Sequence, residues 1–249
     1  MSTAVLLLRL AAPLQSWGSA SRYGRRNTDS RPTKSAVLGL LAAAQGRRRS
    51  DPVADLAGLR FGVRVDQPGV LLRDFHTVSG DRWPDRRLPT AAGGRRPLDT
   101  STQVTERYYL ADAVFLAAVE GDPALITTLA DALRHPAFPL FLGRRSCPPA
   151  TPPLLRIGAG PLEATLAAEP WHAAAHHRRH HRAARVTLAV TVDDPAGGDS
   201  ACDVPVSFAA AGRVHGWRRV RHDTVTVTHP DPPHSPPAGP HDPFLLLTG

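Results

Sequence analysis

Apolar and polar positions alternate in short blocks along the first half of the chain, and two blocks predict its first strand and first helix. Residues 4–10 form an apolar run, interrupted by one arginine and followed by Pro13, which is typical of a buried strand. Small and aliphatic residues fill positions 36–44 soon after Thr33 and stop near Gly46. Because a threonine side chain accepts hydrogen bonds from a first helical turn, the segment predicts a helix with Thr33 as N-cap.

Strand and helix patterns continue to residue 133. Residues 59–66 carry apolar side chains at every second position, as a half-buried strand does. A Gln-Pro-Gly turn at 67–69 leads into a returning strand at 70–78. Residues 108–119 predict a further strand, and residues 123–133 place aliphatic side chains at the spacing of an amphipathic helix.

Residues 79–105 interrupt this pattern. They are polar, charged and poor in core residues, and so long a connection between strands is usually functional or disordered. The order strand, helix, two strands, excursion, strand, helix suits an α+β fold. We therefore expect a ferredoxin-like domain that carries an inserted arm.

Proline-rich connections after the second helix predict a smaller C-terminal unit. Residues 186–192 and 225–228 have strand patterns, so this unit is expected to be mostly β. Residues 229–249 contain seven prolines and are expected to be largely disordered. The predicted organisation is a main domain over 1–148, a small domain over 149–228 and a Pro-rich tail.

The positive charge of the chain is concentrated in its first half. Residues 1–111 hold 18 Lys and Arg against 9 Asp and Glu, a net charge of +9. Residues 112–249 hold 12 against 13, a net of −1, and the two sum to the overall +8. Such a concentration attracts phosphate and favours nucleic-acid binding, although a solvated basic face has the same composition.

Cys147 and Cys202 are the only cysteines, and their separation predicts neither a zinc site nor a disulfide scaffold. Arg9 interrupts the apolar N-terminal run after five residues, which does not fit a signal peptide. No apolar stretch reaches the length of a membrane span. We therefore expect a soluble, cytoplasmic protein without a membrane partner.

The start of the first predicted helix, at Thr33-Lys34-Ser35, is the strongest candidate phosphate site. Unpaired backbone N–H groups and the helix dipole favour an anion there, and Lys34 and Ser35 offer further donors. Simple capping by Thr33 and Ser35 explains the same residues without a ligand. The basic side chains before the helix favour the phosphate site: Arg22, Arg25, Arg26 and Arg31.

A second candidate is the turn Gly143-Arg144-Arg145. Adjacent arginines at a glycine turn suit a bent phosphate backbone, but a charged surface turn has the same residues. Trp17 and Trp83 lie amid polar and basic sequence, where an indole can stack on unpaired bases. Core packing explains Trp17 equally well.

Histidines raise two further possibilities. His76, near Arg73 and with Tyr108 as a helper, offers a general acid or base for metal-independent RNA cleavage, although RNA contact or packing explains a single histidine more simply. The tract 176–181 has histidines at i and i+4, a spacing that can chelate a metal. Its arginines repel cations, so a solvated basic tract is expected. We expect no catalytic residue, no metal and no cofactor.

Five segments, in order, resemble the CasD family, the fifth Cas family as found in type I-E CRISPR Cascade. Together they span roughly residues 6–148, and their combination is far more specific than any one segment. After residue 148 the resemblance fades, so the His/Arg tract and the tail stay without a family interpretation. The five segments are 6–18, 32–44, 73–78, 103–113 and 139–148.

The resemblance implies a ferredoxin-like domain of the RRM type, a protruding β-hairpin thumb at about 79–105, and a small C-terminal part. It also implies a non-catalytic subunit that caps the 5′ handle of the guide crRNA. Its partners would be the large subunit and the backbone subunit of Cascade, with target DNA engaged indirectly.

Two rival functions stay open at the level of sequence. An endoribonuclease would use His76 with Tyr108 or Lys34, since a related subtype processes precursor RNA with its fifth-family member. A protein-contacting scaffold would carry its basic charge incidentally. The full set of predicted RNA-binding residues is Arg22, Arg25, Arg26, Lys34, Ser35, Arg73, His76, Arg82, Trp83, Arg144 and Arg145.

Overall fold

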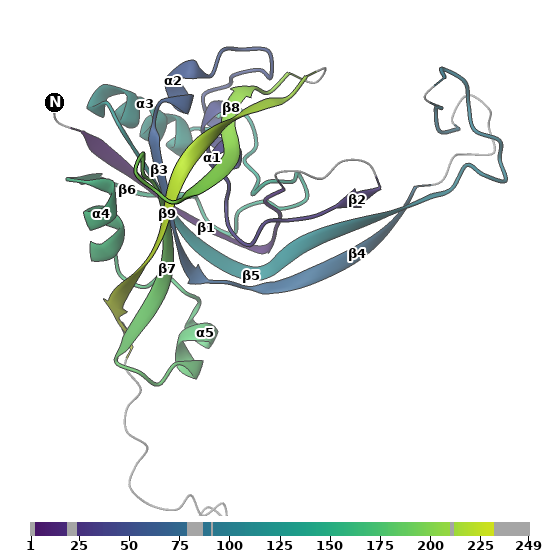
Figure 1. Cartoon of the computed structure of the whole chain (residues 1–249). Coiled ribbons are helices and arrows are strands. Elements are labelled where there is room, and N and C mark those ends of the chain that lie inside the picture. Colours follow the sequence, from purple (N-terminus) through teal and green to yellow (C-terminus); the bar gives the residue numbers. More distant parts are fainter. Residues whose placement is uncertain (1–2, 19–23, 79–86, 91, 210–211, 232–249) are drawn as a thin grey trace, which may run out of the picture.

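A computed structural model describes residues 3–18, 24–78, 87–90, 92–209 and 212–231 of the chain (Figure 1). The predicted site residues Arg22, Arg82 and Trp83, and the tail from residue 232, lie outside the described residues. No helix in the described part is long and apolar enough to cross a bilayer.

The fold is α+β, as expected, and is built on a mostly antiparallel sheet with a few helices. The strand order is β6-β1-β5-β3-β7-β9-β8, and β2 and β4 also pair with β5. The elements are β1 (Ala4–Gln15), β2 (Arg25–Arg26), α1 (Lys34–Ala44), α2 (Ala54–Ala57), β3 (Arg60–Gln67), β4 (Val70–Val78), β5 (Gln103–Gly121), α3 (Pro123–Arg134), β6 (Leu154–Ala159), α4 (Leu162–Ala168), α5 (Ala175–His180), β7 (Arg185–Asp193), β8 (Asp199–Ser207) and β9 (Val214–Thr228).

Residues 4–8 of β1 are all apolar because both faces of the sheet are covered there. Leu6 and Leu8 face the main core with α1 and α3, whereas Val5 and Leu7 face a second core with α4. Side chains of a strand alternate between its faces, so this continuous run fills both cores. Figure 1 shows α4 on the side of the sheet away from α1, α2 and α3.

The predicted helices are confirmed with their caps. Thr33 accepts a hydrogen bond from Ala36 N at 3.3 Å, which is the expected N-cap of α1. At α3, Asp122 caps the helix and Pro123 occupies the first turn, where a missing N–H costs nothing.

The arm is a long two-stranded hairpin, and it begins earlier than the predicted excursion at 79–105. Strand β5 runs for 19 residues, pairing with β3 inside the sheet and with β4 outside it. The pairing from Val70↔Ala111 to Val78↔Gln103 forms the arm (Figure 1). The described part of the arm is therefore regular antiparallel sheet that includes β4. The strand pattern in the sequence alone assigns β4 to the body.

The corner where the arm leaves the sheet has a defined backbone. Asp112 has φ +57°, a left-handed conformation rare outside glycine, and the Gln67 amide donates to its carboxylate at 2.8 Å. Opposite it, Gly69 has φ +72°, and a Cβ there would lie 2.6 Å from the carbonyl oxygen of Ala111. The direction of the arm is thus fixed by Gly69, Gln67 and Asp112.

The sheet runs across the boundary predicted at residue 148. Strand β6 pairs with β1, and β7 pairs with β3, so C-terminal strands extend both edges of the N-terminal sheet. Within the C-terminal part, β7 and β9 were predicted, although β9 is much longer than the segment 225–228. Strands β6 and β8 and helices α4 and α5 were not predicted.

Four charged side chains join α1 to the C-terminal strands. Lys34 Nζ lies 2.8 Å from Asp193, and Lys34 N donates to Asp203 at 2.8 Å. Arg218 bonds both carboxylates. Burial alone would lower the pKa of Arg218, but the hydrogen bonds and charges of Asp203 and Asp193 raise it. We call Lys34, Asp193, Asp203 and Arg218 the buried ion network.

Substituting Asp193 by alanine is expected to destabilise the whole fold. The change leaves Lys34 and Arg218 short of a buried counter-charge, which costs about 3–5 kcal/mol. Urea unfolding of Asp193→Ala should show this loss of unfolding free energy. Asp131→Ala is the matched control, because its pair with Arg134 is exposed (63% and 53% accessible side chains) and should contribute less than about 1 kcal/mol. Equal losses in the two variants would contradict a structural role for the network.

Candidate RNA interface

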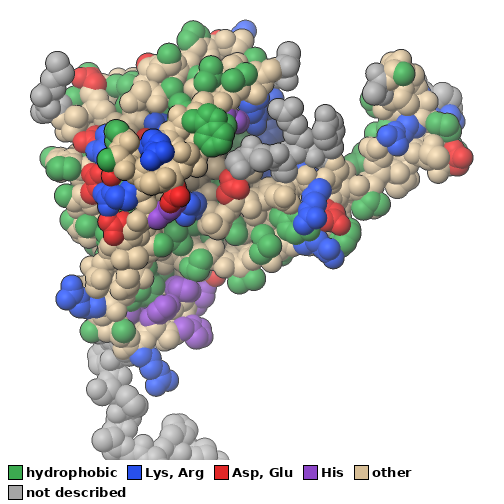
Figure 2. Space-filling model, viewed as in Figure 1, with side chains coloured by type: hydrophobic (Ala, Val, Ile, Leu, Met, Phe, Trp, Pro, Cys, Tyr) green, Lys and Arg blue, Asp and Glu red, His purple; other side chains and the backbone are tan. Residues whose placement is uncertain are grey.

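Three of the predicted arginines, Arg25, Arg26 and Arg73, lie about half-way along the arm, where β2 adds a third strand to β4 and β5. Strand β2 pairs in parallel with β5, with Arg25 beside Glu106 and Arg26 beside Arg107. Residues paired across a sheet share a face, so Arg25 and Arg26 lie on opposite faces of the three-stranded segment β2-β5-β4. We call this segment the arm root. Figure 2 shows basic side chains in this region, beside the body.

The first face of the arm root combines arginine and aromatic rings. The Arg25 guanidinium lies 5.2 Å from the centre of the Tyr108 ring. Arg73 stands directly opposite Tyr108 on β4, and its guanidinium lies 4.4 Å from the ring centre of Phe75. Cation–π contact orients these guanidinium groups without using their N–H donors. Arg25 Nε donates to Asn27 Oδ1 at 3.3 Å, and the terminal N–H groups of Arg25 and Arg73 can reach phosphate oxygens.

The second face carries three arginines. Arg144 stacks over Tyr109 at 4.6 Å, and its Nη2 donates to the carbonyl of Arg26 at 2.9 Å. Arg107 lies beside Arg26 on the same face. Arg107 Nε and Arg144 Nη1 have no hydrogen-bond partner among the described residues. A buried N–H donor without an acceptor lowers the stability of the fold. These two N–H groups are therefore placed to donate to an anion that binds on this face.

Arg107 is a candidate that the sequence reasoning missed. It lies in the segment 103–113 that carries the family resemblance, but nothing in its local sequence separates it from other charged strand residues. Only the pairing with Arg26 brings it into the arginine group.

The turn that carries Arg144 is fixed by close packing. Gly143 has φ +87°, and a Cβ on it would lie 1.7 Å from the carbonyl oxygen of Ser16. Ser16 N donates to the carbonyl of Leu142, and Leu142 N donates to the carbonyl of Cys147. Cys147 is buried in the main core, and burial raises the pKa of its thiol. Arg145, on the same turn, is exposed.

Lys34 and Ser35 do not join this surface, and this corrects the phosphate site expected at the helix start. Both side chains are buried, and Lys34 is engaged by Asp193. The N-terminus of α1 already holds an anion, because its first N–H donates to the Asp203 carboxylate. Trp17 is likewise buried, with its ring edge against Phe115, so it packs in the core and does not stack on bases.

The groups considered for catalysis are also separated. His76 is opposite Thr105 and Tyr108 is opposite Arg73, so the two side chains point to opposite faces of the arm. His76 Nδ1 lies 3.1 Å from Asp74, and the Tyr108 hydroxyl donates to Glu106 at 3.0 Å. His76 is exposed on the arm beyond β2, on the same face as Arg107.

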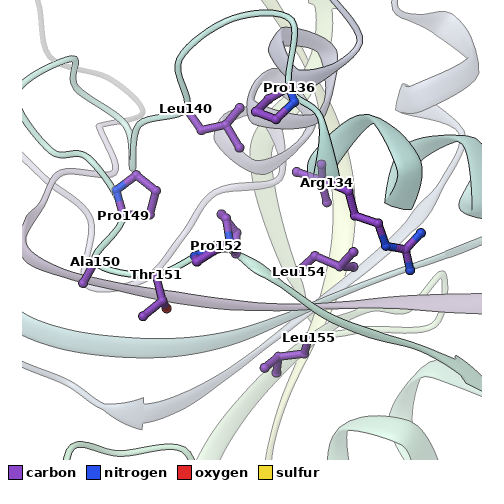
Figure 3. Close-up of a pocket in the computed structure, with 11 residues that line it drawn as sticks. Arg134, Pro136, Leu140, Pro149, Ala150, Thr151, Pro152, Leu154 and Leu155 are labelled. Carbon is purple, nitrogen blue, oxygen red and sulfur yellow. The ribbon is translucent and has the colours of Figure 1, made fainter.

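An open pocket of about 650 Å³ lies apart from the arm root, between the end of α3 and residues 149–155 (Figure 3). Proline and leucine side chains line it, together with Arg134, whose guanidinium is paired with Asp131. Thr151 supplies the only hydroxyl group of this lining, which contains no Cys, His, Asp or Glu.

Comparisons with known proteins agree on one family. A sequence model described as CRISPR-associated protein (Cas_Cas5) matches residues 5–221. The CRISPR system Cascade subunit CasD of Escherichia coli (strain K12) is 36% identical over 181 residues, which cover 66% of this chain and 77% of that protein.

Two solved structures have the same fold. A chain of a CRISPR RNA-guided surveillance complex superposes with a TM-score of 0.78 at 39% identity, covering 94% of this chain and 95% of that one. A crystal structure of a Cas protein superposes with a TM-score of 0.65 at 35% identity, covering 94% and 100%.

Replacing Gly143 by alanine is expected to displace the Arg144 turn. A Cβ at this position adds a clash with Ser16 to the cost of a left-handed backbone, so the loss should exceed about 3 kcal/mol. Gly160→Ala is the matched control, since Gly160 has φ +97° with nothing within 4 Å of its Cβ position. Its free energy of unfolding should fall only by the cost of the left-handed backbone, about 1–2 kcal/mol. Thermal or urea unfolding compares them, and equal losses would contradict the packing argument.

Proposed function

Because this chain belongs to the CRISPR-associated Cas5 family, we propose that it is a non-catalytic subunit of a type I-E Cascade surveillance complex that binds and caps the 5′ handle of the crRNA. The observation that carries this proposal is the arm root. There, arginines gather on both faces, and the guanidinium groups of Arg25 and Arg144 stack on Tyr108 and Tyr109.

Single-stranded RNA is the ligand that this chemistry fits best. Guanidinium groups bind phosphate, while exposed planar and apolar side chains accept unstacked bases. Phe75 is 57% exposed on the face that carries Arg73 and Tyr108. We assign phosphate binding to Arg25, Arg26, Arg73, Arg107, Arg144 and Arg145, and a peripheral RNA contact to His76.

The body that carries the arm is proposed to be a ferredoxin-like domain of the RRM type. The support is the succession β1-α1-β3-β5-α3-β6 with the spatial order β6-β1-β5-β3, each neighbour antiparallel. This is the arrangement of a split β-α-β fold, in which strands 1 and 2 flank strand 3.

The arm also suits contact with another protein. Val70, Leu71 and Val104 are 71%, 61% and 61% exposed, an unusual density of large apolar side chains for a two-stranded ribbon in water. Val70 lies on one face of the ribbon and Leu71 and Val104 on the other. We propose that these apolar side chains contact the backbone subunit, and that the large subunit contacts the body. Target DNA is then engaged through the assembled complex.

A nuclease role has less support. Metal-independent cleavage needs a base for the 2′-hydroxyl and an acid for the leaving oxygen on the same substrate. His76 and Tyr108 point to opposite faces, and Lys34 is buried in the ion network. These separations support the non-catalytic proposal.

Removing two arginines from the second face tests RNA binding directly. Arg26→Ala combined with Arg144→Ala should weaken binding of labelled repeat RNA and lower the log–log salt slope by about 1.4, since each phosphate contact on a single strand contributes about 0.7. The matched control is Arg134→Ala, an exposed arginine on α3 that should leave the slope unchanged.

An unchanged slope in the double variant would remove these residues from the interface. If the wild-type chain and all variants fail to bind repeat RNA, the protein-contacting scaffold replaces the proposal.

Single-turnover incubation with repeat RNA in chelator tests the absence of catalysis. The chain alone is expected to bind without cutting, and His76→Ala should leave precursor processing by a reconstituted system unchanged. A nuclease would lose at least about 100-fold in rate on losing its general acid or base. Cutting at one site that is abolished by His76→Ala, with Tyr108→Phe and Asp74→Ala as companions, would establish the endoribonuclease instead.

A further inference from the structure

The His/Arg tract lies outside the five segments that carry the resemblance in sequence, and it forms the short helix α5. Helix α5 covers Trp171, whose side chain is buried (2% exposed). The rings of His177, His181 and His229 contact the Trp171 ring edge-on, with centroids 5.9, 5.1 and 5.2 Å away. Figure 2 shows a group of histidine side chains around α5. The expectation of a solvated tract therefore does not describe His177 and His181.

Trp171 gives these histidines a rigid support. Arg64 is fully buried, paired with Asp66 at 2.7 Å, and donates to the carbonyls of Leu166, Glu169 and Pro170. Trp171 Nε1 donates to the carbonyl of Asp66 at 2.7 Å. The segment before α5 is thus fixed to β3 by buried hydrogen bonds whose donors and acceptors are all paired. These bonds hold Trp171, and with it the histidines that pack against it, in place.

On this support, two imidazole nitrogens converge. The Nε2 atoms of His177 and His181 lie 3.2 Å apart, and the ring centroids are 4.8 Å apart with planes inclined by 48°. Two imidazoles on one tetrahedral ion, with metal–nitrogen bonds of about 2.0–2.1 Å, would have nitrogens about 3.3 Å and ring centres about 5.3 Å apart. A straight N–H···N bond of the observed length would separate the ring centres by about 5.5 Å. The observed separation of 4.8 Å is shorter than both, so the two rings are bent away from a straight N–H···N line, as two ligands of one ion are.

We propose that His177 and His181 form a two-imidazole binding site for a borderline transition-metal ion such as Zn²⁺. Histidine pairs at i and i+4 present both nitrogens on one side of a helical turn, which suits such ions. This site is independent of the proposed RNA-binding function and reverses the expectation from sequence that the tract holds no metal.

The neighbouring histidines are committed elsewhere, which defines the site. His229 uses both nitrogens, with Nε2 3.0 Å from the carbonyl of Arg178 and Nδ1 accepting from Asp231 N. His176 Nε2 contacts Asp112 at 2.7 Å, and His180 Nδ1 contacts the carbonyl of His176 at 2.7 Å. His177 and His181 have no such outside partner for Nε2 among the hydrogen bonds of the described residues.

The charge around the pair is compatible with a cation. Arg178, between the two histidines, turns to Asp231 and to the carbonyl of Ala173. Within the described residues no third His, Cys, Asp or Glu completes a metal-binding group, so water or a partner's side chain would fill the remaining positions.

Calorimetric titration of the full chain with Zn²⁺, after stripping with chelator and dialysis, tests the site. Saturable binding of one equivalent is expected, with no heat from Mg²⁺, which prefers oxygen ligands. His177→Ala and His181→Ala should each weaken Zn²⁺ binding at least tenfold. His180→Ala is the matched control on the same helix and should stay within twofold of wild type.

His177→Gln guards against an unfolded variant, because it retains a polar side chain of similar reach. It should lose Zn²⁺ binding while its metal-free Tm stays near that of wild type. Absence of saturable Zn²⁺ binding would overturn the proposal and leave His177 and His181 as a pair hydrogen-bonded to each other. An equal loss of affinity in His180→Ala would also overturn it, because Zn²⁺ would then bind non-specifically to the histidines of the whole tract.

Discussion

The carboxylate of Asp193 is the contact on which the arrangement of the body depends. It ends β7, yet it binds Lys34 at the start of α1, Arg218 on β9 and the backbone N–H of Phe61 on β3. Removing one partner of such a shielded ion network leaves another charge unpaired at a cost of several kcal/mol, so the network favours the joint assembly of α1, β3, β7 and β9. The same requirement explains why the chain forms one continuous sheet across the predicted domain boundary. It also explains why the N-terminus of α1 is closed to an external phosphate.

With the helix terminus occupied, the predicted arginines that are grouped with aromatic rings lie at the arm root. Strand β5 is the reason: its inner half is buried between two cores, and its outer half carries Glu106, Arg107 and the two tyrosines. A single strand that is rigid in the core fixes the position of the groups it carries outside. Preorganised arginines lose less conformational entropy on binding than free side chains do.

Local physics predicted the parts of the fold that are locally determined. The Thr33 cap, the amphipathic spacing of α3 and the alternation in β3 could all be predicted from the sequence, because each pattern is set by residues a few positions apart. Lys34 was misassigned because the carboxylates that engage it are 159 and 169 residues away. Strand β8, which supplies Asp203, contains a proline and charged residues and has no clear alternation. Arg107 was missed for the same reason, since only the non-local pairing with β2 gives it neighbours.

The corner at Asp112 connects the arm to helix α5. Its carboxylate accepts from Gln67 and contacts His176 on α5, and Gln67 in turn accepts from Ala174 N at 3.0 Å. The direction of the arm and the seat of α5 therefore share one set of hydrogen bonds. In such a shared network, ordering one element reduces the entropy that the other must lose. Whatever orders α5 therefore also restrains the corner from which the arm extends.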